Sequence, residues 1–116
     1  MSNLIEVGRT NELEDGSIKE TLVRGRQILL ARVGDKYYAT ENHCPHMGGK
    51  LSQGKLEDTV VTCPLHGSQF DLVNGQVVRW LKGSGLISKV SKVLRRPRPL
   101  IVYNVKVKND RILMEI

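Results

Sequence analysis

Aromatic residues are scarce in this sequence, at 4% of its 116 residues. Proteins that bind single-stranded nucleic acids stack the bases on aromatic side chains. The shortage makes nucleic acid the least favoured partner, even though the chain has a formal net charge of +6. A positive charge also suits an anionic membrane surface or an acidic protein, and charge alone does not distinguish these partners.

Long apolar runs are missing as well. No stretch approaches the roughly 18 apolar residues of a membrane-spanning helix, and the N-terminal residues lack the basic and apolar regions of a secretion signal. A cytoplasmic location is therefore expected. With 40% hydrophobic and 26% charged residues, residues 1–116 have the size and composition of one globular domain.

Cysteine is equally rare, because Cys44 and Cys63 are the only two. They could form one disulfide, but both lie close to histidines in a chain without a secretion signal, where metal binding is the better interpretation. They begin two similar short loops, Cys44-Pro45-His46-Met47-Gly48-Gly49 and Cys63-Pro64-Leu65-His66-Gly67-Ser68. Each loop offers one thiolate and one imidazole, and its glycines allow close approach of the backbone.

Two loops of this kind can direct four side chains at one point: Cys44, His46, Cys63 and His66. Two soft thiolates suit an iron that stays ferric, whereas two neutral imidazoles suit the iron that accepts an electron. A structural zinc site or a bare disulfide is the alternative. Zinc fingers usually pair Cys-x₂₋₄-Cys with His-x₃₋₅-His, so the alternating order here favours the two-iron centre.

The pattern Cys-x-His, a spacer and Cys-x-x-His resembles that of the Rieske family, in which two histidines replace two cysteines on one iron of a [2Fe–2S] cluster. The resemblance covers most of the chain, including residues 33–39, residues 67–71 and the closing hairpin. It implies that Cys44 and Cys63 bind one iron and that His46 and His66 bind the other. One Rieske-type cluster is thus the expected cofactor.

The resemblance also implies a set of supporting residues around the cluster: Met47, Gly48, Gly67, Ser68 and Pro97. The methionine would cover the cluster, and the proline belongs to a segment that shields it from a third side in the family. His43 precedes the first cysteine, but the ligand pattern is complete without it. We expect it to be a surface or supporting residue.

Many short runs of β-branched and aliphatic residues, separated by turns, predict an all-β antiparallel sandwich or barrel. The resemblance adds a small cluster-binding subdomain, with loops at about 43–49 and 63–68. Asn74-Gly75 predicts a tight hairpin between residues 69–73 and 76–78, and Asn109-Asp110 predicts another between residues 101–107 and 112–116. Further strands are expected over 4–7, 20–23, 28–33, 37–40 and 59–62.

The basic insert at about residues 81–96 differs from the rest of the chain in its composition and spacing of residues. Apolar residues recur there at helical spacing with lysines and serines between them, which predicts one inserted amphipathic helix. Packing on the barrel is the first interpretation. Docking of a partner and binding to a membrane surface, which is the least favoured of the three, both remain open.

In its small size and the expected absence of a membrane anchor, the chain resembles the Rieske-type ferredoxins of bacterial oxygenase systems. The resemblance implies a soluble electron-transfer protein that takes one electron from a flavoprotein reductase and passes it to an oxygenase or another redox enzyme, by transient docking. Such a carrier is not itself an enzyme. The alternative is an accessory Rieske subunit of a larger reductase such as nitrite reductase.

High-potential members of the family carry an extra cysteine in each loop and a tyrosine whose hydroxyl binds a ligand sulfur. Gly49, Leu65 and Phe70 stand at the matching places. Losing a donor to sulfur disfavours the more negative reduced state. We therefore expect a potential toward the low end of the roughly −150 to +300 mV Rieske range.

Overall fold

The structure is a computed structural model that describes residues 4–45, 49–64, 67–79 and 99–115. Within these ranges there are strands and two short 3₁₀ turns but no α-helix, and no helix is long and apolar enough to cross a membrane. The helix predicted for residues 81–96 lies outside the described residues. The strands are β1 (Leu4–Arg9), β2 (Ile18–Val23), β3 (Arg26–Val33), β4 (Lys36–Glu41), β5 (Lys55–Glu57), β6 (Val60–Thr62), β7 (Gln69–Asp71), β8 (Val77–Arg79), β9 (Val102–Tyr103), β10 (Val105–Lys108) and β11 (Arg111–Glu115).

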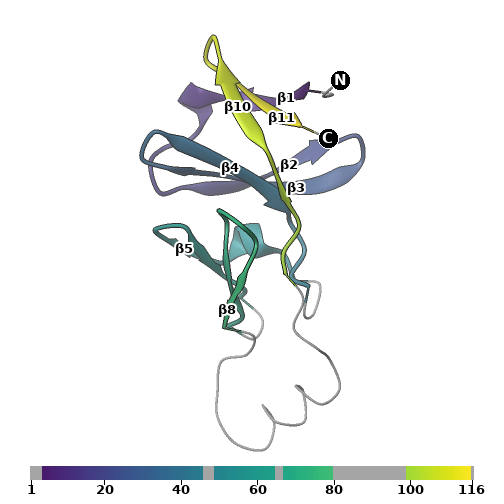
Figure 1. Ribbon diagram of the computed structural model, residues 1–116, viewed down its shortest axis with the longest axis vertical. Coiled ribbons are helices and arrows are strands. Elements are labelled where there is room, and N and C mark those ends of the chain that lie inside the picture. Colours follow the sequence, from purple (N-terminus) through teal and green to yellow (C-terminus); the bar gives the residue numbers. More distant parts are fainter. Residues whose placement is uncertain (1–3, 46–48, 65–66, 80–98, 116) are drawn as a thin grey trace, which may run out of the picture.

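The strands form three antiparallel sheets, which confirms the all-β antiparallel prediction. Their orders are β1-β11-β10, β2-β3-β4-β9 and β5-β6-β7-β8. The first two sheets lie together, and the third forms a smaller unit at the opposite end from the β10–β11 hairpin (Figure 1). The loops with the two cysteines begin at this lower end, one after β4 and one after β6.

Strand β3 separates two hydrophobic cores. Ile28 and Leu30 face a core shared with β1 and β11, whereas Leu29 and Ala31 face a core shared with the β5–β8 sheet, and all four are fully buried. Successive side chains of a strand point to opposite faces, so a strand covered on both faces is a continuous apolar run. This run is the strongest strand signal in the sequence, and it joins the two halves of the molecule.

Residues 101–107 were expected to form one strand, and this prediction is wrong in detail. The strand breaks at Asn104, so that β9 pairs with β4 whereas β10 pairs with β11. The carbonyl of Asn104 accepts a hydrogen bond from the Glu115 amide at 2.9 Å, which holds the chain where it changes sheets. The closing turn agrees with the prediction, because Asn109 and Asp110 both have positive φ angles, 52° and 64°, as a type I′ turn requires.

The Asn74-Gly75 turn is longer than predicted. Strands β7 and β8 are joined by residues 72–76, and only Gly75 has a positive φ, at 76°. The Asn74 side chain instead accepts a hydrogen bond from the Gln76 amide at 2.9 Å, which is an Asx turn. A two-residue type I′ turn needs left-handed conformations at both positions, and the wider loop brings Gly75 against Leu100, whose amide donates to the Gly75 carbonyl at 2.8 Å.

Candidate metal centre

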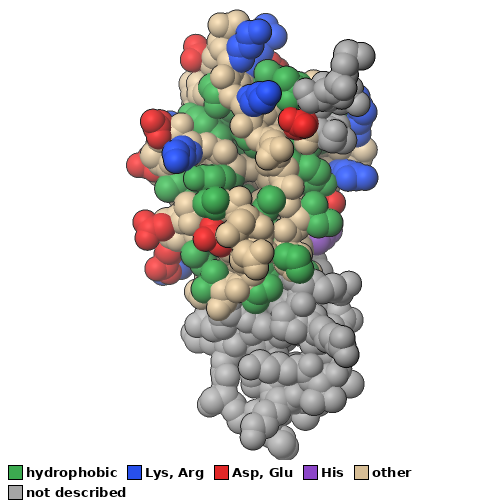
Figure 2. Space-filling model, in the orientation of Figure 1, with side chains coloured by type: hydrophobic (Ala, Val, Ile, Leu, Met, Phe, Trp, Pro, Cys, Tyr) green, Lys and Arg blue, Asp and Glu red, His purple; other side chains and the backbone are tan. Residues whose placement is uncertain are grey.

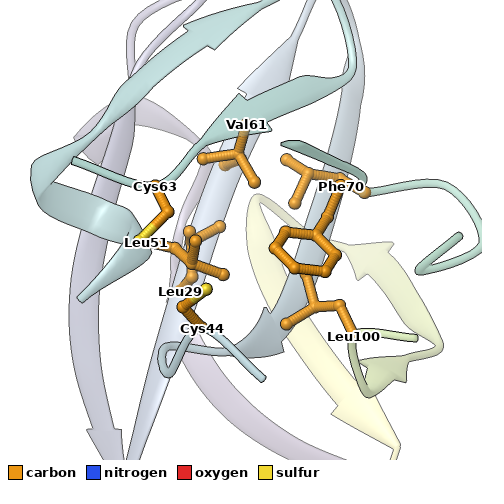
Figure 3. Close-up of a cluster of buried hydrophobic side chains, with 9 residues drawn as sticks. Leu29, Cys44, Leu51, Val61, Cys63, Phe70 and Leu100 are labelled. Atoms are coloured by element: carbon orange, nitrogen blue, oxygen red, sulfur yellow. The ribbon is translucent and has the colours of Figure 1, made fainter. Parts of the chain in front are cut away.

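The two cysteines belong to one buried cluster of side chains, which we call the cysteine core. Cys44 and Cys63 are each 2% exposed, although they follow strands of different sheets, β4 and β6. In Figure 3 both lie beside Leu51, on the side of the core away from Phe70. The members of the cysteine core are Leu29, Ala31, Cys44, Leu51, Val61, Cys63, Phe70, Leu72 and Leu100.

Both loops are closed by the same backbone hydrogen bond. The Cys44 amide donates to the Gly49 carbonyl at 2.8 Å, and the Cys63 amide donates to the Ser68 carbonyl at 2.7 Å. Each bond runs from the cysteine to the residue five positions later. The similarity of the two loop sequences is thus matched by the same backbone closure.

Gly67 and Ser68 occupy positions that suit a tight loop around a cofactor. Gly67 has a φ of 73°, a left-handed conformation that side chains with a Cβ rarely adopt, and its amide donates to the Cys63 carbonyl at 3.1 Å. Ser68 is fully buried. The structure therefore places both residues within the second loop, Gly67 half-buried and Ser68 fully buried.

Several residues of the predicted site lie outside the described residues: His46, Met47, Gly48, His66 and Pro97. Within the ranges that are described, no group of three His, Cys, Asp or Glu side chains could hold a metal ion. His43 is described, and it is exposed as expected. The described part of the site therefore consists of two buried sulfurs and the loops that carry them.

The chemistry of this setting fits a Rieske-type cluster. Two ferric ions, two sulfides and two thiolates have a net charge of zero, whereas a cluster held by four thiolates carries two negative charges. Burying an uncompensated charge among apolar side chains is costly. Apolar side chains surround both cysteines in the cysteine core, so a neutral cluster bound by the two thiolates suits this setting better than a charged one.

A pocket of about 300 Å³ lies next to the first loop. It opens between Cys44 and the segment Pro99–Ile101, which is tied to β4 by a hydrogen bond from the Glu41 amide to the Ile101 carbonyl at 3.0 Å. The chain thus returns from the proline-containing segment directly beside the first cysteine. The lining residues are Glu41, His43, Cys44, Pro45, Pro99, Leu100 and Ile101.

Sequence reasoning missed two polar residues that flank the first loop. Asn42 is fully buried, and its side chain contacts Ser52 on the far side of the loop. An asparagine at the end of a strand usually indicates only a turn. The sequence held no sign that these two residues meet, because ten positions separate them.

The Rieske [2Fe-2S] domain family matches residues 3–88, which is more than half of the chain. The chain is also similar to the ferredoxin component of the naphthalene 1,2-dioxygenase/salicylate 5-hydroxylase systems of Ralstonia sp. The two are 28% identical over 114 residues, which cover 98% of this chain and 96% of the relative. The likeness to this ferredoxin thus extends over nearly the whole length of both proteins.

Solved structures show the same fold. A chain in the complex of reduced oxygenase and oxidized ferredoxin of carbazole 1,9a-dioxygenase has a TM-score of 0.77 at 28% identity, over 97% of this chain and 92% of that chain. A protein described as the small subunit of an NADPH nitrite reductase has a TM-score of 0.74 at 18% identity, over 97% of both chains. At 18% identity the likeness concerns the fold alone, so the accessory-subunit alternative gains no functional support. Together with the two cysteine loops, the family match shows that this chain belongs to the Rieske [2Fe–2S] domain family, whose cofactor is one [2Fe–2S] cluster.

Proposed function

We propose that this chain is the Rieske-type ferredoxin of an oxygenase system. It takes one electron from a flavoprotein reductase and passes it to the oxygenase, and it makes no product of its own. The observation that carries this proposal is the end-to-end match to a ferredoxin component of dioxygenase systems. A matching chain has also been seen in a complex of an oxygenase with its ferredoxin, which supports the oxygenase as acceptor.

Cys44 and Cys63 hold one iron in this proposal, and His46 and His66 hold the other. The common backbone closure of the two loops supports the assignment, since it gives both cysteines the same setting. The bound cluster supplies a one-electron couple. The chain's own contribution is to hold the two thiolates in a dry core and to keep the loops rigid, so that little reorganisation accompanies electron transfer.

Met47, Gly48, Gly67, Ser68 and Pro97 surround the cluster in this proposal. The return of Pro99 and Leu100 to the side of Cys44 supports a shielding role for the proline-containing segment that precedes them. Electron entry and exit are assigned to the end of the molecule that bears the loops. Donor and acceptor then dock there in turn, which suits a carrier that must release each partner.

The decisive experiment is metal and sulfide analysis of anaerobically purified protein, followed by low-temperature EPR after reduction with dithionite. We expect about two irons and two acid-labile sulfides per chain. The reduced protein should give a rhombic signal whose average g lies below that of clusters with four cysteine ligands. Zinc in place of iron, with no signal, would overturn the proposal in favour of a structural metal site.

We also propose that residues 81–96 form an amphipathic helix, and that the protein acts in the cytoplasm. Support for the helix is the spacing of apolar residues in the sequence.

The positive charge of the chain is concentrated in the same segment. Residues 80–98 contain six Lys and Arg and no Asp or Glu, so they account for the whole net charge of +6. In the rest of the chain both signs are mixed, as on the face in Figure 2. A Val90→Pro substitution should reduce the helical far-UV circular dichroism, because proline breaks a helix interior; an unchanged spectrum would refute the helix.

A further inference from the structure

A buried asparagine joins the two ends of the first cluster loop. Asn42 follows β4 and is fully buried. Its side-chain Oδ1 accepts a hydrogen bond from the Ser52 amide at 2.7 Å, and its Nδ2 donates to the Ser52 Oγ at 2.7 Å. Residues 43–51, which include Cys44 and His46, lie between these two partners. One side chain therefore closes the base of the loop.

The same amide group is anchored to β2, which belongs to the same sheet as β4. Nδ2 of Asn42 also donates to the Glu20 carboxylate on β2 at 2.8 Å. The Lys50 ammonium lies 3.4 Å from that carboxylate, so the loop is tied to Glu20 from its other end as well. Since the amide faces a donor on one side and a carboxylate on the other, its orientation is chemically determined.

The second loop has no need of such a side chain. Its two ends are strands β6 and β7, which pair directly through Val61 and Phe70 and their neighbours. The first loop begins after β4 and ends at the 3₁₀ turn Leu51–Gln53, and within the described residues no strand pairing connects these two elements. Asn42 thus supplies to the first loop the closure that a β-ladder gives to the second.

We propose that Asn42 is a positioning residue, which holds the first loop in the shape that retains the cluster, with Glu20 as its anchor. This inference rests on the proposed ligand set, because it assumes that Cys44 and His46 bind the cluster. Leu51 at the end of the loop belongs to the same buried core as the two cysteines. An opening at the base would therefore displace the wall of the core next to them.

We call the hydrogen bonds of Asn42 to Ser52 and Glu20 the Asn42 clamp. A charge swap tests this clamp in the iron-loaded protein. In Asn42→Asp alone, two carboxylates meet where a hydrogen bond of 2.8 Å stood, and we expect cluster loss to a ferrous chelator to become on the order of tenfold faster. The double variant Asn42→Asp with Glu20→Gln restores a donor facing an acceptor and keeps the total charge. It should return the rate to within about twofold to threefold of the wild type.

Thr40→Val is the matched control. Thr40 is also a fully buried polar residue of β4, but its hydroxyl donates to the adjacent Glu41 carbonyl and not to the loop. We expect this variant to lower stability without accelerating iron release. Amide hydrogen exchange at Ser52 gives a readout that does not depend on the iron, and it should speed up in Asn42→Asp and recover in the double variant.

Three results would overturn the clamp. Asn42→Asp could lose its cluster no faster than the wild type, the double variant could fail to recover the wild-type rate of cluster loss, or Thr40→Val could lose its cluster as fast as Asn42→Asp. If Asn42→Asp does not fold, Ser52→Ala replaces it, since this change removes one of the two bonds between the loop ends. Its release rate should then exceed that of Thr40→Val, and the reverse order refutes the clamp. A wild-type protein without iron would instead overturn the proposed function, so the two failures are distinguishable.

Discussion

In the sequence, His43 precedes Cys44 and His46 follows it two positions later, and only His46 is proposed as a ligand. His43 is exposed and borders the pocket beside the first loop. We expect His46→Ala and His66→Ala to lose the cluster, because an iron then lacks a nitrogen donor, and His43→Ala to retain it. Iron content and visible absorbance measure the outcome; loss of iron in His43→Ala to the same degree would show that the ligand assignment is wrong.

We expect the side chain at position 70 to influence the reduction potential through the presence or absence of a single hydroxyl group. Its ring is fully buried in the cysteine core and has no hydroxyl to donate to a ligand sulfur. Phe70→Tyr should raise the midpoint potential, since a donor to sulfur stabilises the reduced state. A hydrogen bond worth about 1 kcal/mol corresponds to roughly 40 mV in a one-electron couple.

Potentiometric EPR titration measures this shift, and Phe70→Leu is the control for altered packing without a hydroxyl. The leucine variant should not show the rise. A potential that falls in Phe70→Tyr, or that rises equally in both variants, would contradict the hydrogen-bond explanation. A wild-type midpoint above about +200 mV would contradict the expected low end of the Rieske range.

The loop between β7 and β8 packs against the C-terminal part of the chain, where Gly75 contacts Leu100. Gly75 has a φ of 76°, and a Cβ at this position would collide with the Leu100 carbonyl oxygen. Gly75→Ala should therefore reduce the free energy of unfolding by about 3 kcal/mol, from the left-handed conformation and from displacement of backbone together. Leu100 lies in the cysteine core, so we also expect weaker retention of the cluster.

Gly25→Ala is the matched comparison for this change. Gly25 has a φ of 80°, and a Cβ there would meet nothing within 4 Å. This variant should lose only the conformational term, roughly 1 to 2 kcal/mol. Urea denaturation of both proteins separates the two contributions, and equal losses would show that close approach to Leu100 is not what requires glycine at position 75.

The molecule as a whole is expected to carry electrons without reacting further. A reductive titration should consume one electron per chain, because only one iron of a Rieske cluster changes valence. With a flavoprotein reductase and NADH, the protein should support turnover of an added oxygenase. Without the oxygenase, no hydroxylated product should form. Coulometry and product analysis measure these outcomes; product formed without oxygenase would contradict the carrier role.

Several strands and turns of the fold could be predicted from local sequence patterns. The aliphatic run over residues 28–33 indicated a strand, and Asn109-Asp110 indicated a hairpin; both are confirmed. Asn74-Gly75 misled, because the short-range signal for a hairpin was outweighed by a side-chain hydrogen bond and by packing against Leu100. Local propensity could not register a contact with a residue 25 positions away.

The sequence by itself determined the chemistry: which donors are available, at what spacing, and therefore which cofactor they suit. Ligand preference depends on atom types and short loops, which are local properties of the chain. Only the tertiary structure decided that Cys44 and Cys63 share one core, that both loops close through the same hydrogen bond, and that Asn42 bridges to Ser52. The shared core and the Asn42–Ser52 bridge are contacts between segments apart in the chain, and they arise because the sheets must bury their apolar faces and pair the polar groups left inside.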